Sequence, residues 1–141
     1  DVGCAKGFLV QDLLAVCPGL EAFGLDLSAY ALAHAAAQVR PRLVRGDAAW
    51  LPFEDGSVDA VISINTVHNL NRPLCAQALR ELMRVSRRHR YVQVDAYRSP
   101  EEKAIFLQWV LTAKTHGEPD AWRTLFQEAG YDGDYYWTIT E

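Results

Sequence analysis

The sequence predicts an α/β fold: a doubly wound sheet, mostly parallel, with an antiparallel C-terminal strand and three layers α/β/α. Apolar, β-branched segments alternate along the chain with segments whose apolar residues recur at helical spacing. A glycine turn stands directly before the first of these helical segments. The 141 residues contain no internal repeat or domain-scale linker, which favours a single domain over residues 1–141.

The chain begins with Asp1-Val2-Gly3-Cys4-Ala5-Lys6-Gly7, which reads as a strand end, a glycine turn and a helix start. Glycine permits a tight turn and the close approach of a ligand, and a helix N-terminus offers unpaired N–H groups to an anion. The same glycines also occur as plain loop-to-helix punctuation, so both interpretations stay open here. Only two residues of a strand precede the turn. We therefore expect the numbering to start inside a longer protein, without most of the first strand or any N-terminal extension.

Two short strands and a helix are predicted next. Leu20–Leu25 is an apolar run that ends at Asp26. Ser28 is a plausible N-cap for an alanine-rich helix that continues to about Val39. Arg42–Arg45 is a short strand candidate that stops before Gly46 and Asp47.

The middle of the chain carries the most strand-like segment. Residues 51–57 form a surface loop by their turn residues. Val58–Ile64 is almost continuously apolar, as in a strand buried on both faces. Pro73 then suits the first residue of a helix with Ala78, Leu79, Leu82 and Val85 on one face.

The last third alternates in the same way. Tyr91–Tyr97 is a strand, and Ser99-Pro100-Glu101-Glu102 has the form of a capping box that opens a helix to about Lys114. Ala121–Ala129 is a second helix that stops at Gly130, and Tyr135–Thr140 is a final strand, expected to be antiparallel. The aromatic residues on the stripes of these helices, expected in the core, are Trp109, Trp122 and Phe126.

The predicted strands end at Asp1, Asp26, Arg45, Ile64 and Tyr97, and we expect them in the spatial order third, second, first, fourth, fifth. Ligands of parallel sheets bind at the carboxyl ends of the strands, near the switch point. The glycine turn, Asp26, Asp47 and residues 65–68 all fall there. This convergence predicts a site.

Composition narrows the function classes. The formal net charge is −4, so no global basic field points to nucleic acid. The cluster Arg84, Arg87, Arg88 and Arg90 is interpreted as a solvated helix end. Three cysteines without a C-x-x-C pair favour a reducing compartment, and we expect a cytoplasmic protein with no membrane partner. The histidines show no ligand spacing, so no metal is expected; they are His34, His68, His89 and His116.

Six segments together form a family pattern: Asp1–Gly7, Gly24-Leu25-Asp26-Leu27-Ser28, Gly46-Asp47-Ala48, Leu51-Pro52-Phe53, Asp59–Ser63 and Ala129-Gly130-Tyr131. Through them nearly the whole chain resembles the class I S-adenosylmethionine-dependent methyltransferases, which implies a Rossmann-like sheet. The first segment departs from the family pattern because Ala5 replaces the middle glycine and adds a methyl group to the loop.

The resemblance implies S-adenosyl-L-methionine as the cofactor. The turn would keep side chains away from its methionine part, and Asp26 would accept from both ribose hydroxyls. Asp47 would accept from the adenine amine while the Ala48 N–H bonds the ring. The implied cofactor-binding residues are Asp1, Gly3, Ala5, Gly7, Asp26, Leu27, Asp47, Ala48 and Asn65. As alternatives, Asp26 could cap the following helix and Asp47 could serve only a turn.

Methyl transfer from a sulfonium is a displacement by the acceptor, so the protein mainly supplies proximity and orientation. A general base is needed only where the acceptor arrives protonated, and His68 is the candidate. The alternative is that His68 caps a loop and shapes the site. Asp95 and Tyr97 end the next predicted strand and could reach the substrate.

The expected partner is a small-molecule methyl acceptor, which the sequence does not identify. The segment Arg98–Pro119, with Trp109, Lys114 and His116, is the insert expected to shape its site. A nicotinamide-dependent oxidoreductase would require G-x-G-x-x-G and leave Asp47-Ala48 unexplained. A non-catalytic cofactor-binding or scaffold protein of the same fold is the other alternative.

Overall fold

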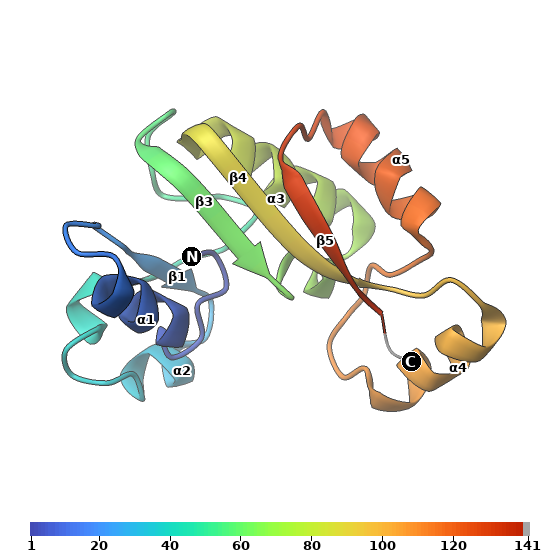
Figure 1. Cartoon of the computed structure of the whole chain (residues 1–141), viewed down its shortest axis with the longest axis horizontal. Helices are drawn as coiled ribbons and strands as arrows, with labels where there is room; N and C mark the ends of the chain where they lie inside the picture. Colours follow the sequence, from blue (N-terminus) through green and yellow to red (C-terminus); the bar gives the residue numbers. More distant parts are fainter. Residues whose placement is uncertain (140–141) are drawn as a thin grey trace.

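The five named strands of the structure all pair in parallel (Figure 1). A computed structural model describes residues 1–139. β1 (Gly24–Asp26) pairs with β2 (Leu43–Arg45). The second sheet has the order β3 (Val58–Ile64), β4 (Ser86–Ala96), β5 (Asp134–Ile139).

Val2 joins these two sheets. It forms a parallel bridge with Leu25 of β1, and its N–H donates to the Ile62 carbonyl of β3 at 2.8 Å. The Ser63 hydroxyl donates to the Val2 carbonyl at 3.1 Å. The spatial order is therefore β2, β1, the first-strand residues, β3, β4, which confirms the predicted order. As expected, of the residues described, only Asp1 and Val2 occupy the position of the first strand, so the centre of the sheet has few paired residues.

The direction of the last strand was predicted wrongly. β5 runs parallel to β4, with Tyr91 opposite Asp134 and Ala96 opposite Ile139; Thr140, the predicted last residue of this strand, lies outside the described residues. α5 (Pro119–Ala129) packs on α3 (Arg72–Val85) and returns the chain to the end of the sheet where β4 begins. A crossover of this kind produces a parallel strand, whereas an antiparallel neighbour follows from a hairpin.

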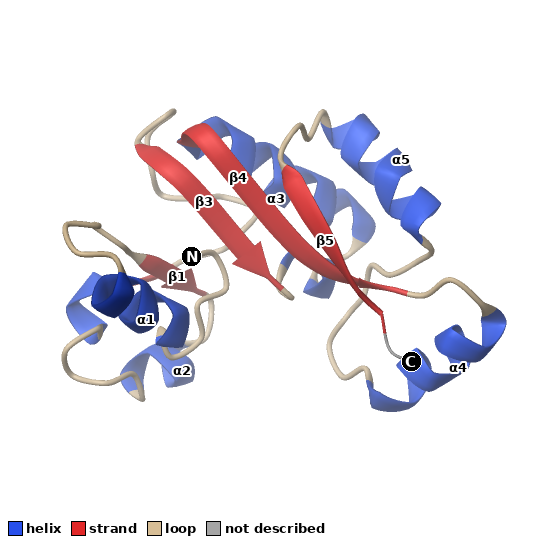
Figure 2. Ribbon diagram, in the orientation of Figure 1, coloured by secondary structure: helices blue, strands red, loops and turns tan. Residues whose placement is uncertain are grey.

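Helices cover one face of the three-stranded sheet. Figure 2 shows α3 and α5 on that face, and no helix within residues 1–139 overlies the other. Val92 and Val94 of β4 are fully buried on the helical side, whereas Gln93 between them is only half-buried. The predicted third layer is therefore not seen over these strands. For the same reason β3 is not buried on both faces: Val61 is buried, but Ile64 is 37% exposed.

Three predicted helices begin as expected and two end early. α1 (Phe8–Val16) follows the glycine turn. α2 (Ala29–Ala33) starts at Ser28, whose hydroxyl accepts from the Ala31 N–H at 3.1 Å. It ends at Ala33 rather than Val39 because the chain then turns to bury Ala35 and Val39 beneath Val10 of α1.

α4 (Pro100–Trp109) likewise begins at its Ser99 cap. It ends at Trp109 rather than Lys114, since the N–H groups of Lys114 and Thr115 both donate to the His68 carbonyl at 2.9 Å and hold that segment away from the helix. The prediction that Trp109 is a core residue is wrong, as its exposed fraction is 44%.

The arginine cluster was predicted to be a solvated helix end, but only Arg84 lies in the last turn of a helix, α3. β4 begins at Ser86, directly after α3, so Arg87, Arg88 and Arg90 lie on a strand. The Arg87 Nε donates to Asp59 at 2.8 Å, and the Arg90 Nη1 to Asp132 at 2.6 Å. Among residues 1–139, every helix is too short or too polar to span a lipid bilayer.

Candidate functional site

A cavity of about 370 Å³ lies at the carboxyl ends of β1, β2 and β3. This volume is within the ordinary range for small-molecule sites. Seven of the cofactor-binding residues expected from the sequence line it: Gly3, Ala5, Asp26, Leu27, Asp47, Ala48 and Asn65. Parallel strands bring these separate segments together because their carboxyl ends meet at one edge.

The glycine turn forms one wall of the cavity. Gly3 has φ +86° and Gly7 has φ +77°, a conformation that residues with a Cβ seldom adopt. Ala5 is also left-handed, with φ +47°, where the family pattern has glycine. Its N–H donates to Asp26 Oδ2 at 2.8 Å, which holds the residue in a conformation that costs alanine roughly 1–2 kcal/mol.

Asp26 ties the turn to the end of β1. Its Oδ2 accepts from Ala5, and its Oδ1 accepts from the Ser28 N–H at 2.8 Å. A carboxylate has about four acceptor positions, so Asp26 keeps capacity for a ligand's hydroxyls. The cap of α2 is the Ser28 hydroxyl rather than Asp26.

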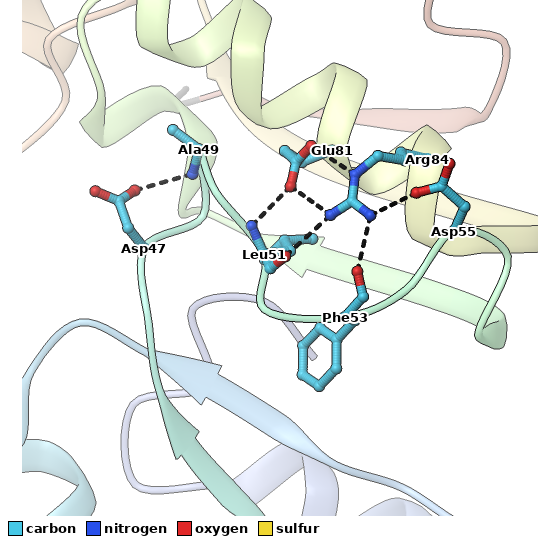
Figure 3. Close-up of polar contacts among 7 residues, drawn as sticks. All are labelled: Asp47, Ala49, Leu51, Phe53, Asp55, Glu81 and Arg84. Atoms are coloured by element: carbon cyan, nitrogen blue, oxygen red, sulfur yellow. Dashed lines mark hydrogen bonds and ion pairs between the residues drawn. The ribbon is translucent and has the colours of Figure 1, made fainter.

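Asp47 and Ala48 form the opposite wall, just after β2. Figure 3 shows the Asp47 carboxylate turned back on its own loop, where Oδ1 accepts from the Ala49 N–H at 2.9 Å. This is a local turn bond of the kind expected for aspartate. Asp47 lines the cavity, and its second carboxylate oxygen keeps acceptor capacity.

Two residues of the first motif do not line the cavity. The backbone carbonyl of Asp1 accepts from the Leu25 N–H, and the Asp1 backbone nitrogen donates to the Phe23 carbonyl at 2.8 Å. Gly7 faces β2 instead: a Cβ placed there would lie 3.0 Å from the Leu43 side chain. Gly7 therefore lets α1 pack closely against β2.

His68 does not line the cavity, although the adjacent Asn69 does; it lies in a short 3-10 helix (Val67–Asn69) and is only 4% exposed. Its Nδ1 accepts from the Asp95 N–H at 3.3 Å and lies 3.5 Å from Asp95 Oδ2. Burial lowers the pKa of His68, although Asp95 acts against this, and burial raises the pKa of Asp95. An acceptor nitrogen at Nδ1 fits a neutral imidazole.

Several further residues that the sequence did not single out as cofactor-binding residues also line the cavity: Leu25, Gly46, Ile64, Thr66, Asn69 and Leu70. Thr66 follows Asn65 at the end of β3, so its position in the sequence was the available signal. Asn69 Oδ1 is buried without a hydrogen-bond partner, and its Nδ2 donates to the Asn65 carbonyl at 3.2 Å. Asn69 Oδ1 is therefore one more acceptor at this edge to which a ligand could donate a hydrogen bond.

The insert after β4 contacts His68 through the backbone of Lys114 and Thr115. Tyr97 is buried, and its hydroxyl lies 3.3 Å from His116 Nδ1. Phe106 of α4 packs on both rings, with centroid distances of 5.7 Å to Tyr97 and 5.1 Å to His116. Asp95 is also part of the framework here, since its carbonyl accepts from Trp122 Nε1 at 2.9 Å.

Comparison with known proteins agrees with this geometry. A family model described as "Methyltransferase domain" matches residues 1–94. No match is found among curated proteins.

Solved structures share the fold. A Haloferax volcanii protein in complex with the Trm112 methyltransferase activator aligns at TM-score 0.73 and 24% identity, over 92% of this chain and 58% of that one. A SAM-dependent methyltransferase of Archaeoglobus fulgidus aligns at 0.70 and 17%, over 92% and 58%. PigF, solved with SAH, aligns at 0.73 and 17%, over 94% and 44%. The chain thus spans less than two thirds of the length of each, and at these identities the likeness concerns the fold.

Proposed function

The chain belongs to the class I S-adenosylmethionine-dependent methyltransferase family, and from this premise we propose that it binds S-adenosylmethionine in the cavity and transfers the methyl group to a small-molecule acceptor. The observation that carries the proposal is the position of Asp26. Its carboxylate lies at the cavity, held by two backbone N–H groups at 2.8 Å each. A fixed carboxylate at this strand end suits a ribose diol.

The remaining contacts follow from the walls of the cavity. Asp47 accepts from the adenine amine, and the Ala48 N–H bonds the ring. Gly3, Ala5 and Asn65 line the part of the cavity where the methionine part of the cofactor would lie. Asp1 and Gly7 act through the turn, because Asp1 pairs with β1 and Gly7 packs against β2.

When bound, the cofactor supplies an activated methyl group on a sulfonium, so the chain's residues need only orient the two reactants and exclude water. We propose that His68 is not the base of this reaction. It is buried, faces Asp95 and does not line the cavity. Its carbonyl instead anchors residues 114–115 of the insert.

The acceptor class rests on charge. With a net charge of −4, a small molecule is favoured over nucleic acid. The alternative is a scaffold of the same fold that binds the cofactor without turnover. Such a protein would not produce S-adenosylhomocysteine, whereas a methyltransferase would.

The full-length protein should be incubated with S-adenosylmethionine and a panel of amine, hydroxyl, thiol and carboxylate metabolites, with S-adenosylhomocysteine quantified by mass spectrometry. Acceptor-dependent product that is lost in Asp26→Ala supports the proposal. Tight binding of S-adenosylhomocysteine without product for any acceptor favours the scaffold, and no binding at all refutes both.

A further inference from the structure

Glu81 and Arg84 lie one turn apart on α3 and face the loop that follows β2. Figure 3 shows both side chains directed at the backbone of this loop. Glu81 is only 8% exposed, which is unusual for a glutamate on a helix. Neither residue lines the cavity.

Every N–H of the Arg84 guanidinium is used. Nη2 donates to the Leu51 carbonyl at 2.9 Å and to Glu81 at 2.7 Å. Nη1 donates to the Phe53 carbonyl at 2.8 Å and to Asp55 at 2.7 Å. Nε donates to Glu81 Oε1 at 2.7 Å. Only a guanidinium offers five donors in this fixed arrangement.

Glu81 binds the same loop residue as Arg84, Leu51, but through its backbone N–H. Its Oε2 accepts from the Leu51 N–H at 2.7 Å, so the N–H and carbonyl of Leu51 are both held by these two side chains. Hydrogen bonds from Arg84 and Leu51 hold the pKa of Glu81 below its ordinary value and keep it ionised.

The attached loop carries a wall of the cavity. Leu51 stands three residues after Ala48, and the intervening Ala49 is buried and bonded to Asp47. Within residues 47–57 the other backbone bonds are short local ones, from Trp50 to Asp47 and from Ser57 to Glu54. One further backbone hydrogen bond joins this loop to α3, since the Gly56 N–H donates to the Arg84 carbonyl at 2.8 Å.

We propose that Glu81 and Arg84 are positioning residues for the adenine end of the cofactor cavity. They fix Leu51, and through it the Asp47 carboxylate and the Ala48 N–H, at the distance that the adenine edge requires. This inference rests on the proposed function, since it concerns how the same cavity recognises the adenine base of the cofactor.

The test compares two ligands on the same variants by calorimetric titration. S-adenosylhomocysteine presents the adenine amine as a donor and a ring nitrogen as an acceptor. S-inosylhomocysteine replaces the amine with a carbonyl and carries a proton on that ring nitrogen, so in the same pose it presents an acceptor to Asp47 and a donor to the Ala48 N–H. The wild-type protein should therefore prefer S-adenosylhomocysteine.

Glu81→Gln should weaken S-adenosylhomocysteine binding roughly tenfold, as loss of a residue that orients a ligand contact does, and should weaken S-inosylhomocysteine by less than about twofold. Arg84→Lys should show the same selectivity, because a lysine cannot span both loop carbonyls. It keeps a cation beside Glu81, so it tests the inference even if Glu81→Gln fails to fold. The matched control is Glu128→Gln, the same exchange in an exposed ion pair with Arg72, which should change neither affinity.

Equal losses for both ligands would mean general loosening and would overturn the inference, as would no loss for either. A wild-type protein that binds both ligands equally would also overturn it, because the cavity would then not distinguish the hydrogen-bonding groups of adenine from those of hypoxanthine. A wild-type protein that does not bind S-adenosylhomocysteine at all would instead refute the proposed function.

Discussion

Gly3 packs directly against the side chain of Thr66, so closely that a Cβ on Gly3 would lie 1.9 Å from Thr66 Oγ1. The contact joins the first turn to the end of β3, residues that are far apart in the sequence. Thr66 is held in place because its hydroxyl donates to the Ile64 carbonyl at 3.0 Å. Gly3 is therefore required by a close contact as well as by its φ of +86°.

Gly3→Ala should lower the free energy of unfolding by about 2–4 kcal/mol, from left-handed strain plus overpacking. Gly19→Ala is the matched control: it has φ +85° and nothing within 4 Å of the added Cβ, so it should cost only about 1 kcal/mol. Urea denaturation of both variants measures the difference. Equal costs would show that Thr66 moves aside easily.

Asp26→Ala should weaken S-adenosylhomocysteine binding by on the order of 2–3 kcal/mol, because two ribose hydroxyls lose a charged acceptor. It should also lower stability, since the Ala5 and Ser28 N–H groups lose their partners. Calorimetric titration and urea denaturation separate the two effects. The control is Asp12→Ala on the exposed side of α1, and unchanged affinity in Asp26→Ala would remove the central contact of the proposed site.

His68→Gln should leave the turnover rate at saturating cofactor nearly unchanged and should preserve any acidic limb of the pH–rate profile. The reason is that His68 is buried against Asp95 rather than exposed to the cavity. A loss of roughly 10²-fold in rate with cofactor affinity intact would instead identify His68 as a general base.

His68 should also leave a signature in stability. Burial lowers its pKa below the ordinary 6.5, opposed by Asp95 and assisted by His116. The unfolded chain thus binds a proton on this residue more readily than the native state. The contribution of His68 is fully present above about pH 6.5 and is lost as the pH falls below it. Thermal unfolding from pH 7.5 to 5.5 should show a shallower pH dependence in His68→Gln than in the wild type, and identical slopes would contradict this assignment.

Glu81 should leave a signature of the same sign as that of His68, but at lower pH. Its pKa is lowered from the ordinary 4.5, first by the bond from Arg84, so the unfolded chain takes up the proton first. Its contribution is present above pH 4.5 and is lost as the pH falls through the native pKa. Glu81→Gln should be less stable than wild type at pH 7 by roughly 1–3 kcal/mol. This gap should narrow between pH 5 and pH 3 in urea denaturation, whereas a constant gap would show that the carboxylate charge does not matter.

Local signals in the sequence were sufficient for most element positions. Ser28 and Ser99 cap the helices they were predicted to cap, and Gly130 ends α5 with φ +70°. Caps and turns depend on residues within a few positions of one another, so they can be predicted without the tertiary fold. The alternation of strands and helices likewise predicted parallel strands joined by right-handed crossovers, and the order of the first five strands followed from the Rossmann-like topology that the resemblance implies.

The sequence by itself therefore determined the helix starts, the strand order and the gathering of Asp26, Asp47 and the glycine turn at one sheet edge. The tertiary structure decided the parallel direction of β5, the early ends of α2 and α4, and the burial of His68 against Asp95. It also decided that Arg84 holds Leu51. The physical reason is separation along the chain: His68 and Asp95 are 27 residues apart, and Arg84 and Leu51 are 33 apart. Such contacts form only after helices and strands have packed, and no local pattern of residue types records which distant partner each side chain meets.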